Sequence, residues 1–178
     1  MCRYNNMADP SYALSDTDIQ QAIGVKPTLY YPDLFKVDDI NQILDKKGRA
    51  VILYLTTSLT NGHWVGLIKK GKTIEYFDPY GHYKPDGESR WLTKNKQHQL
   101  HEDTHRLTDL LNKSGYEVTV NPFPYQGHQQ GNNECGRHTV SRLYYYKLSE
   151  PEYMEMIRKS GLTPDQFALQ TSYSLLGK

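Results

Sequence analysis

GHWVGLIKKGKTIEYFDP, residues 62–79, is the segment of this chain with the clearest structural pattern. Within it, residues 64–68 and 73–77 are rich in aliphatic and aromatic side chains, which is typical of strands. The polar residues KKGK between them include a glycine and predict a turn that joins two antiparallel strands. His63 stands at the start of the first strand and Asp78 at the end of the second. In an antiparallel hairpin these two side chains should lie at the same end, within reach of each other.

The sequence around this hairpin predicts an α+β domain. Residues 50–56, AVILYLT, have no polar interruption and predict a strand buried on both faces at the centre of a sheet. Residues 116–120 alternate as a further strand. Leucines at 100, 107, 110 and 111 predict an amphipathic helix over residues 100–114 that ends at Gly115. Further helices are predicted at 15–24, from Cys135, near 150–159 and after Thr163.

The composition limits the class of protein. The 178 residues suit one domain, predicted over 15–178 after a flexible end at 1–14. Lys and Arg total 21 against 20 Asp and Glu, so a net charge of +1 gives no long-range attraction to nucleic acid or membranes. No stretch approaches the roughly 18 apolar residues of a membrane span, and there is no signal-peptide pattern. We expect a soluble, intracellular protein that is not secreted.

Cys135 is the candidate nucleophile. It follows the loop QGHQQGNNE, residues 126–134, which is too polar and glycine-rich to be core, and a helical spacing of apolar residues begins after it. A thiol at a helix N-terminus is stabilised as the thiolate. Gly136 would let a substrate approach closely. The alternative reading of Cys135 is a small buried core residue.

His63 is the candidate general base and Asp78 the carboxylate that orients it. Alternatively, His63 is a solvated loop histidine and Asp78 caps a turn before Pro79. His128 and His138 also flank the cysteine, but His138 lies one turn into the predicted helix, where it can simply pack.

The motifs GHWVGL, EYFDPYG and QQGNNECG, in this order, resemble those of adenain, the adenovirus maturation protease, and of its SUMO-specific relatives. The resemblance runs from Asn61 to Arg142, roughly half the chain. It implies a papain-like α+β fold with permuted connections, in which helices flank a central mixed sheet. It also implies cleavage after small residues such as Gly, by catalytic residues His63, Asp78, Gln129 and Cys135.

The resemblance further implies that the Gln129 amide and the Cys135 backbone N–H hold the oxyanion, and that Trp64 packs beside the His63 ring and excludes water. Trp64 and Gly136 are thus the expected substrate-binding residues. Gln126 and Gln130 remain alternatives to Gln129.

Two other motifs compete with this interpretation. GLIKKGKT, residues 66–73, matches the phosphate-loop pattern, but it leads into a strand where a phosphate loop leads into a helix. HEDTH, residues 101–105, matches the zinc-protease pattern on a helix. No third zinc ligand is placed downstream, and the two histidines should face solvent.

We therefore expect a thiol endopeptidase without metal or cofactor that matures capsid proteins of a virus or virophage, in the host cytoplasm or nucleus and in the virion. The alternatives are an enzyme that removes a ubiquitin-like modifier, an inactive binding module and a zinc protease. The expected partner is a protein substrate, either a capsid precursor or a ubiquitin-like conjugate. Adenain-like enzymes can require an activating peptide and DNA, and Cys2 could tether such a peptide. We expect a monomer and no membrane partner.

Overall fold

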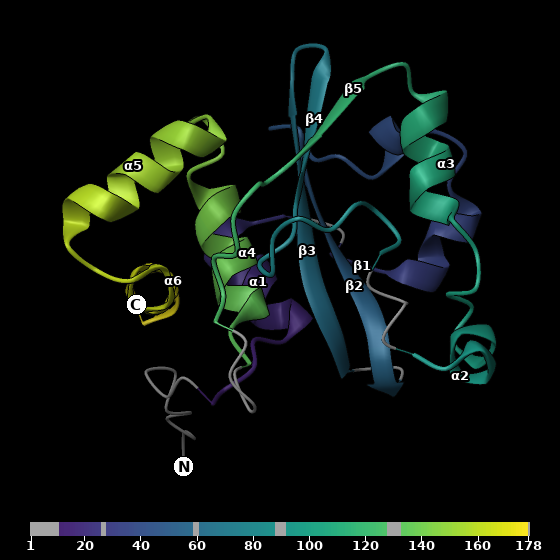
Figure 1. The fold of residues 1–178 in the computed structure, drawn as a ribbon, viewed down its shortest axis with the longest axis horizontal. Helices are drawn as coiled ribbons and strands as arrows, with labels where there is room; N and C mark the ends of the chain where they lie inside the picture. The colour runs from purple at the N-terminus through teal and green to yellow at the C-terminus, as the bar shows by residue number, and fades with distance from the viewer. Residues whose placement is uncertain (1–10, 26–27, 59–60, 88–91, 128–132, 178) are drawn as a thin grey trace.

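A computed structural model describes residues 11–25, 28–58, 61–87, 92–127 and 133–177 of the chain. Its framework is one five-stranded mixed sheet in the order β1-β2-β3-β4-β5, with helices on both sides (Figure 1). The strands are β1 Thr28–Tyr30, β2 Arg49–Ser58, β3 Asn61–Lys70, β4 Thr73–Phe77 and β5 Glu117–Val120. The sheet order follows the chain order, so the long antiparallel hairpin forms its middle.

The predicted hairpin is present, and it shows that residues 66–73 are not a phosphate loop. β3 pairs antiparallel with both β2 and β4, while the edge strands β1 and β5 pair in parallel with β2 and β4. Residues 66–73 run from the end of β3 through a tight turn at Gly71, where φ is +58°, into β4. No helix follows this stretch that could bind a phosphate.

One face of the sheet is covered by helices α1, Asp16–Ile23, α4, Cys135–Tyr144, and α6, Pro164–Leu176, with α5, Glu150–Ser160, packed farther out (Figure 1). The ends of α1 are those that the sequence predicts. Ser15 and Asp18 form a capping box, and Gly24 ends the helix in the left-handed conformation. Thr163 caps α6 in the same way.

The other face carries the short 3₁₀ helices η1, Tyr31–Lys36, and η2, Ile40–Gln42, together with α3, Arg106–Lys113. β2 is buried on both faces, as predicted. Ala50, Ile52 and Tyr54 point into the core under α3, whereas Val51, Leu53 and Leu55 point into the core under α1 and α4. β2 is an interior strand, but β3 is the central one.

The prediction of one helix over residues 100–114 is wrong for its first half. A short helix, α2, Lys94–Gln99, ends before Leu100, and α3 begins only at Arg106. Residues 101–105 lie between them, with His101 at φ +56° and the Glu102 side chain turned inward to accept the Leu55 backbone N–H at 2.5 Å. This buried contact overrides the helical pattern.

The zinc-protease motif is therefore not on a helix. His101 and His105 are both exposed, as predicted, but they lack the one-turn spacing that a shared metal needs. The zinc-protease reading is thus wrong. In the described ranges, none of the helices has the length and apolar character that crossing a membrane requires.

Candidate active site

His63 and Asp78 meet at one end of the hairpin, as the sequence predicts. The His63 ring, on the third residue of β3, bonds through Nε2 to Asp78 Oδ1 at 2.7 Å. Both side chains are buried, at 5% and 0% exposure. Because Asp78 engages Nε2, the other ring nitrogen, Nδ1, is left for a second partner.

Asp78 is held from several sides. Its carboxylate also accepts the Tyr80 backbone N–H at 2.9 Å. The Asn121 side chain accepts the Asp78 backbone N–H at 2.9 Å and donates to the Asp78 carbonyl at 2.8 Å. Asn121 is 1% exposed and directly follows β5. Sequence reasoning missed Asn121, and its only sequence signal is its position between a strand and Pro122.

Cys135 is the first residue of α4, the position predicted from the sequence. Burial opposes ionisation of its thiol, but a hydrogen bond and the positive charge of His63, with backbone N–H groups of Trp64 and Gly136, lower the pKa of Cys135. The pKa of His63 shifts in the opposite direction. Burial would lower the pKa of the imidazole, but Asp78 and Cys135 raise it to about 10. The two shifts favour a thiolate–imidazolium pair at neutral pH.

The aromatic neighbour of His63 is Tyr80. The His63 and Tyr80 rings stack with centroids 4.7 Å apart and planes 11° apart. Trp64 follows His63 in the strand and belongs to the core under α1 and α4. The expected packing of Trp64 beside the His63 ring stays a prediction.

The Trp64 side chain contacts the N-terminal segment, residues 11–14. Its indole N–H donates to the Leu14 carbonyl at 3.0 Å, and Leu14 is only 3% exposed. Gly136 lies against the same residues, since an added Cβ would come within 3.0 Å of Leu14 and 3.1 Å of Trp64. Gly136 thus makes room for the protein's own packing. Within the predicted flexible end, residues 11–14 lie against the domain.

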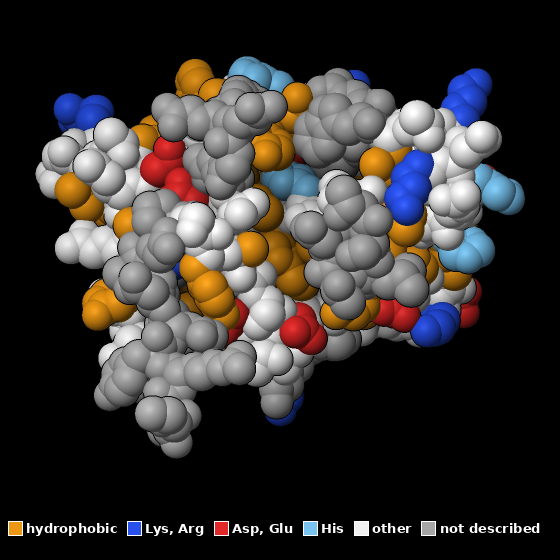
Figure 2. All heavy atoms as spheres, turned by 90° about the horizontal axis from the view of Figure 1, so that it is seen from below, with side chains coloured by type: hydrophobic (Ala, Val, Ile, Leu, Met, Phe, Trp, Pro, Cys, Tyr) orange, Lys and Arg blue, Asp and Glu red, His pale blue; other side chains and the backbone are white. Residues whose placement is uncertain are grey.

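A cavity of ≈ 210 Å³ opens beside the nucleophile. Its walls include Leu14, Tyr30, Leu53 and Trp64, and Cys135 contributes to the same lining. Figure 2 looks onto the end of the sheet where β2 and β3 are joined, and it shows hydrophobic side chains exposed in a hollow there. Trp64 and Cys135 thus line one cavity, and the role of Trp64 and Gly136 in substrate binding stays a prediction.

The predicted oxyanion donor Gln129 lies outside the described residues, as do Gln130 and His128. Gln126 is described and is 2% exposed, and its backbone N–H donates to the Pro79 carbonyl at 2.9 Å. The loop that leads to Cys135 is therefore joined to the turn that follows Asp78. His138 does not serve as a second base, because its Nε2 bonds to Asp165 Oδ1 at 2.8 Å.

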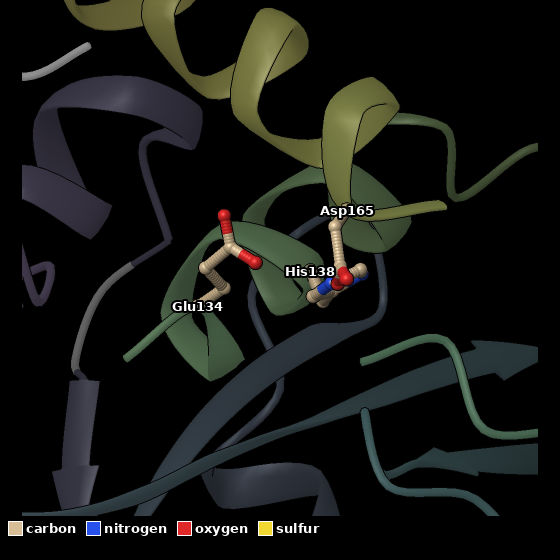
Figure 3. A group of neighbouring side chains, drawn as sticks. All are labelled: Glu134, His138 and Asp165. Carbon is tan, nitrogen blue, oxygen red and sulfur yellow. The ribbon is translucent and has the colours of Figure 1, made fainter. Parts of the chain in front are cut away.

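One group among the described residues has donor atoms close enough together to hold a metal ion. It consists of Glu134, His138 and Asp165, whose ligand atoms lie within 4.8 Å of one another (Figure 3). His138 Nε2 donates to Asp165 Oδ1 at 2.8 Å, and the Glu134 side chain is a further hydrogen-bond partner of Asp165.

No protein-family model matches the chain. The "Uncharacterized protein V9" of Sputnik virophage is 29% identical over 160 residues, which cover 86% of this chain and 90% of that protein. The ASFV pS273R protease has a TM-score of 0.50 at 16% identity, over 94% of this chain and 68% of that one. The SUMO protease Ulp1 has a TM-score of 0.41 at 16% identity, over 99% and 88%. The likeness to the ASFV protease confirms the predicted fold class, an α+β fold with a mixed sheet flanked by helices.

Proposed function

We propose that this chain, which has the α+β fold of a viral cysteine protease, is a thiol endopeptidase that cleaves after small residues such as Gly. The observation that carries the proposal is the position of His63 between Asp78 and Cys135, with the pKa of His63 raised and that of Cys135 lowered. An inactive binding module has no need of such a pair, because separating two charges in a buried site is costly without chemistry to perform.

The proposed reaction begins with attack of the Cys135 thiolate on the carbonyl carbon of the scissile peptide bond. The carbonyl electron pair moves to oxygen, where the Cys135 backbone N–H and the Gln129 side chain donate to the oxyanion. Each such donor contributes about 3 kcal/mol. The His63 imidazolium then gives its proton to the leaving amine, the C–N bond breaks, and a thioester to Cys135 remains.

Hydrolysis of the thioester uses the same groups in reverse. His63, now neutral, takes a proton from a water molecule as that water attacks the thioester carbon. The C–S bond breaks, the acid product leaves, and the thiolate–imidazolium pair is restored. Throughout, Asp78 holds the ring orientation through Nε2 and stabilises its charged form.

The cavity beside Cys135 supports a preference for small residues. Its volume of ≈ 210 Å³ is below the roughly 300 Å³ at which ligand pockets usually begin, so it suits one or two small side chains next to the scissile bond. Trp64 and Leu53 give it apolar walls.

We further propose that the substrate is a capsid precursor, cleaved in infected cells and in the virion. The supporting observations are the virophage relative and the viral protease with the same fold. An activating peptide or DNA is part of this proposal because of the resemblance to adenain. The net charge of +1 neither supports nor excludes such an activator.

The test is hydrolysis by the purified chain of fluorogenic peptides with Gly before the scissile bond, with and without added DNA. A capsid precursor and a modifier ending in Gly-Gly serve as parallel protein substrates. We expect cleavage of the precursor that is lost in Cys135→Ala and in His63→Ala. Turnover of the Gly-Gly modifier alone would instead identify a deconjugating enzyme. If no substrate is cleaved and the pKa of Cys135 is that of an ordinary thiol, the chain is a binding module.

A further inference from the structure

Asp165 lies away from the catalytic triad, yet its carboxylate gathers hydrogen bonds from both sides of the segment that leads to the nucleophile. It is the second residue of α6, and in Figure 3 its side chain extends from that helix onto α4. The carboxylate accepts from His138 Nε2 at 2.8 Å, from the Gly127 backbone N–H and from the Glu134 side chain.

Gly127 and Asn133 are the described residues on either side of 128–132, and Glu134 follows Asn133. Glu134 directly precedes Cys135, and it is 5% exposed although it carries a carboxyl group. An added Cβ on Gly127 would lie 3.4 Å from Asp165 Oδ2, so the backbone passes close to that oxygen. A single carboxylate thus contacts Gly127, which precedes residues 128–132, and Glu134, which follows them and directly precedes α4.

His138 is the buried donor that fixes this carboxylate. It is 0% exposed, and burial lowers its pKa although Asp165 works in the opposite direction, so the ring is neutral at pH 7. Its Nδ1 has no hydrogen-bond partner among the described residues, which places the single ring proton on Nε2, facing Asp165. His138 lies one turn after Glu134, and its backbone N–H donates to the Glu134 carbonyl at 3.0 Å.

The negative charge of Asp165 is stabilised by the N–H groups of His138 and Gly127. Charge-assisted hydrogen bonds of this kind are about twice as strong as neutral ones.

We propose that Asp165 is a positioning residue of the active site, whose carboxylate, fixed by His138, clamps Gly127 and Glu134 and so sets the backbone that delivers Cys135. In the proposed protease, the Cys135 backbone N–H donates to the oxyanion, and its direction depends on the preceding residue. The catalytic part of this inference therefore rests on the proposed function, whereas the clamp itself does not.

The experiment compares Asp165→Ala and Asp165→Asn with Asp109→Asn. Asp109 is an exposed acidic residue in the first turn of α3, so it controls for the loss of a favourable charge at a helix N-terminus. Hydrogen exchange of peptides that contain Gly127 and Glu134 to Arg137 is measured first. We expect exchange to be at least about tenfold faster in Asp165→Ala, smaller acceleration in Asp165→Asn, and no change in Asp109→Asn.

Activity is measured second, on the same variants. Because misplaced catalytic groups slow the chemical step, we expect kcat to fall about 10- to 100-fold in Asp165→Ala with little change in KM. If the wild-type chain cleaves nothing, the proposed function fails, but the exchange result still decides whether the clamp exists.

Two outcomes would overturn the clamp. One is unchanged exchange at Gly127 and Glu134 in Asp165→Ala while the exchange of β2 and β3 shows a folded sheet. The other is a wild-type chain that gains thermal stability with added Zn²⁺ while Asp165→Asn does not, which would make the cluster a cation site.

Discussion

At the scale of single residues, the site depends on an imidazole that serves two partners. Asp78 bonds to His63 Nε2 at 2.7 Å, and the Cys135 thiol bonds to the same ring. Burial disfavours charge on both His63 and Cys135, so the charged pair depends on Asp78 beside the imidazolium and on the attraction of the two ions for each other. Removal of either partner should therefore return the other toward the uncharged form.

This coupling predicts the reactivity of the thiol. In a Cys2→Ser background, Cys135 should react with iodoacetamide well below the pH at which an unperturbed thiol of pKa about 8.5 reacts. His63→Ala should shift the profile upward by more than one unit, so that the rate at pH 6.5 falls more than about tenfold. The rate is followed by mass spectrometry. Equal profiles in the two proteins would show that His63 does not activate the thiol.

Asn121 predicts a second effect at this scale. Asn121→Ala leaves the buried Asp78 N–H without its partner, while the Asp78 carbonyl keeps the Gly81 N–H, and it should lower the free energy of unfolding by about 1–3 kcal/mol. It should also slow alkylation of Cys135, because Asp78 then holds His63 less firmly. Urea denaturation measures the first effect. Asn112→Ala, on the exposed side of α3, should change neither quantity.

At the scale of elements, the N-terminal segment acts as a support of the site. Leu14 packs against Gly136 at the start of α4, and backbone carbonyls within residues 11–14 accept hydrogen bonds from Trp64, Arg137 and Asn133. Residues that precede the first helix thus contact the elements that carry the base and the nucleophile.

Leu14→Ala should therefore affect both stability and reactivity. Loss of a buried leucine costs about 2–5 kcal/mol, and the space left beside Gly136 and Trp64 should reduce the alkylation rate of Cys135. Leu44→Ala is the matched control, because Leu44 packs against the core on the other face of the sheet. That variant should lose stability without loss of thiol reactivity. A similar loss of reactivity in both variants would mean that the segment has no specific role.

Local patterns predicted those elements whose ends are determined by their own residues. The hairpin at Gly71, the capping box at Ser15 and the start of α4 at Cys135 agree with the sequence, and so do the positions of His63 and Asp78. The turn around Glu102 could not be predicted, because its cause is the Leu55 backbone N–H, 47 residues away. For the same reason the sequence did not reveal that Asn121 and Asp165 belong to the site.

At the level of the whole molecule, the sheet separates two cores, and the triad combines two residues of the hairpin with one residue of a helix packed on the sheet. His63 and Asp78 come from the hairpin, whereas Cys135 comes from a helix packed on one face (Figure 1). The site is therefore intact only when sheet and helix are docked. Any group that changes the global stability with pH also changes the range over which the site persists.

Glu102 is such a group. It is 2% exposed, and burial, opposed by the Leu55 hydrogen bond and reinforced by Asp86, raises its pKa from 4.5 to about 7. Between these values the folded protein keeps a proton that the unfolded chain releases, so the free energy of unfolding falls as pH rises from 4.5 to 7 and this contribution is constant above. One pKa unit corresponds to about 1.4 kcal/mol.

Glu102→Gln should remove this pH dependence, since the amide oxygen still accepts the Leu55 N–H while no charge is buried. The variant should match the wild type near pH 4.5 and exceed its free energy of unfolding by about 1–3 kcal/mol above pH 7. Urea denaturation at several pH values measures the difference, with Glu117→Gln, on the exposed side of β5, as the control that shows none. A Glu102→Gln difference that stays constant across pH would mean that the Glu102 carboxyl has the same pKa in the folded and the unfolded chain. Ionisation of Glu102 would then not destabilise the fold.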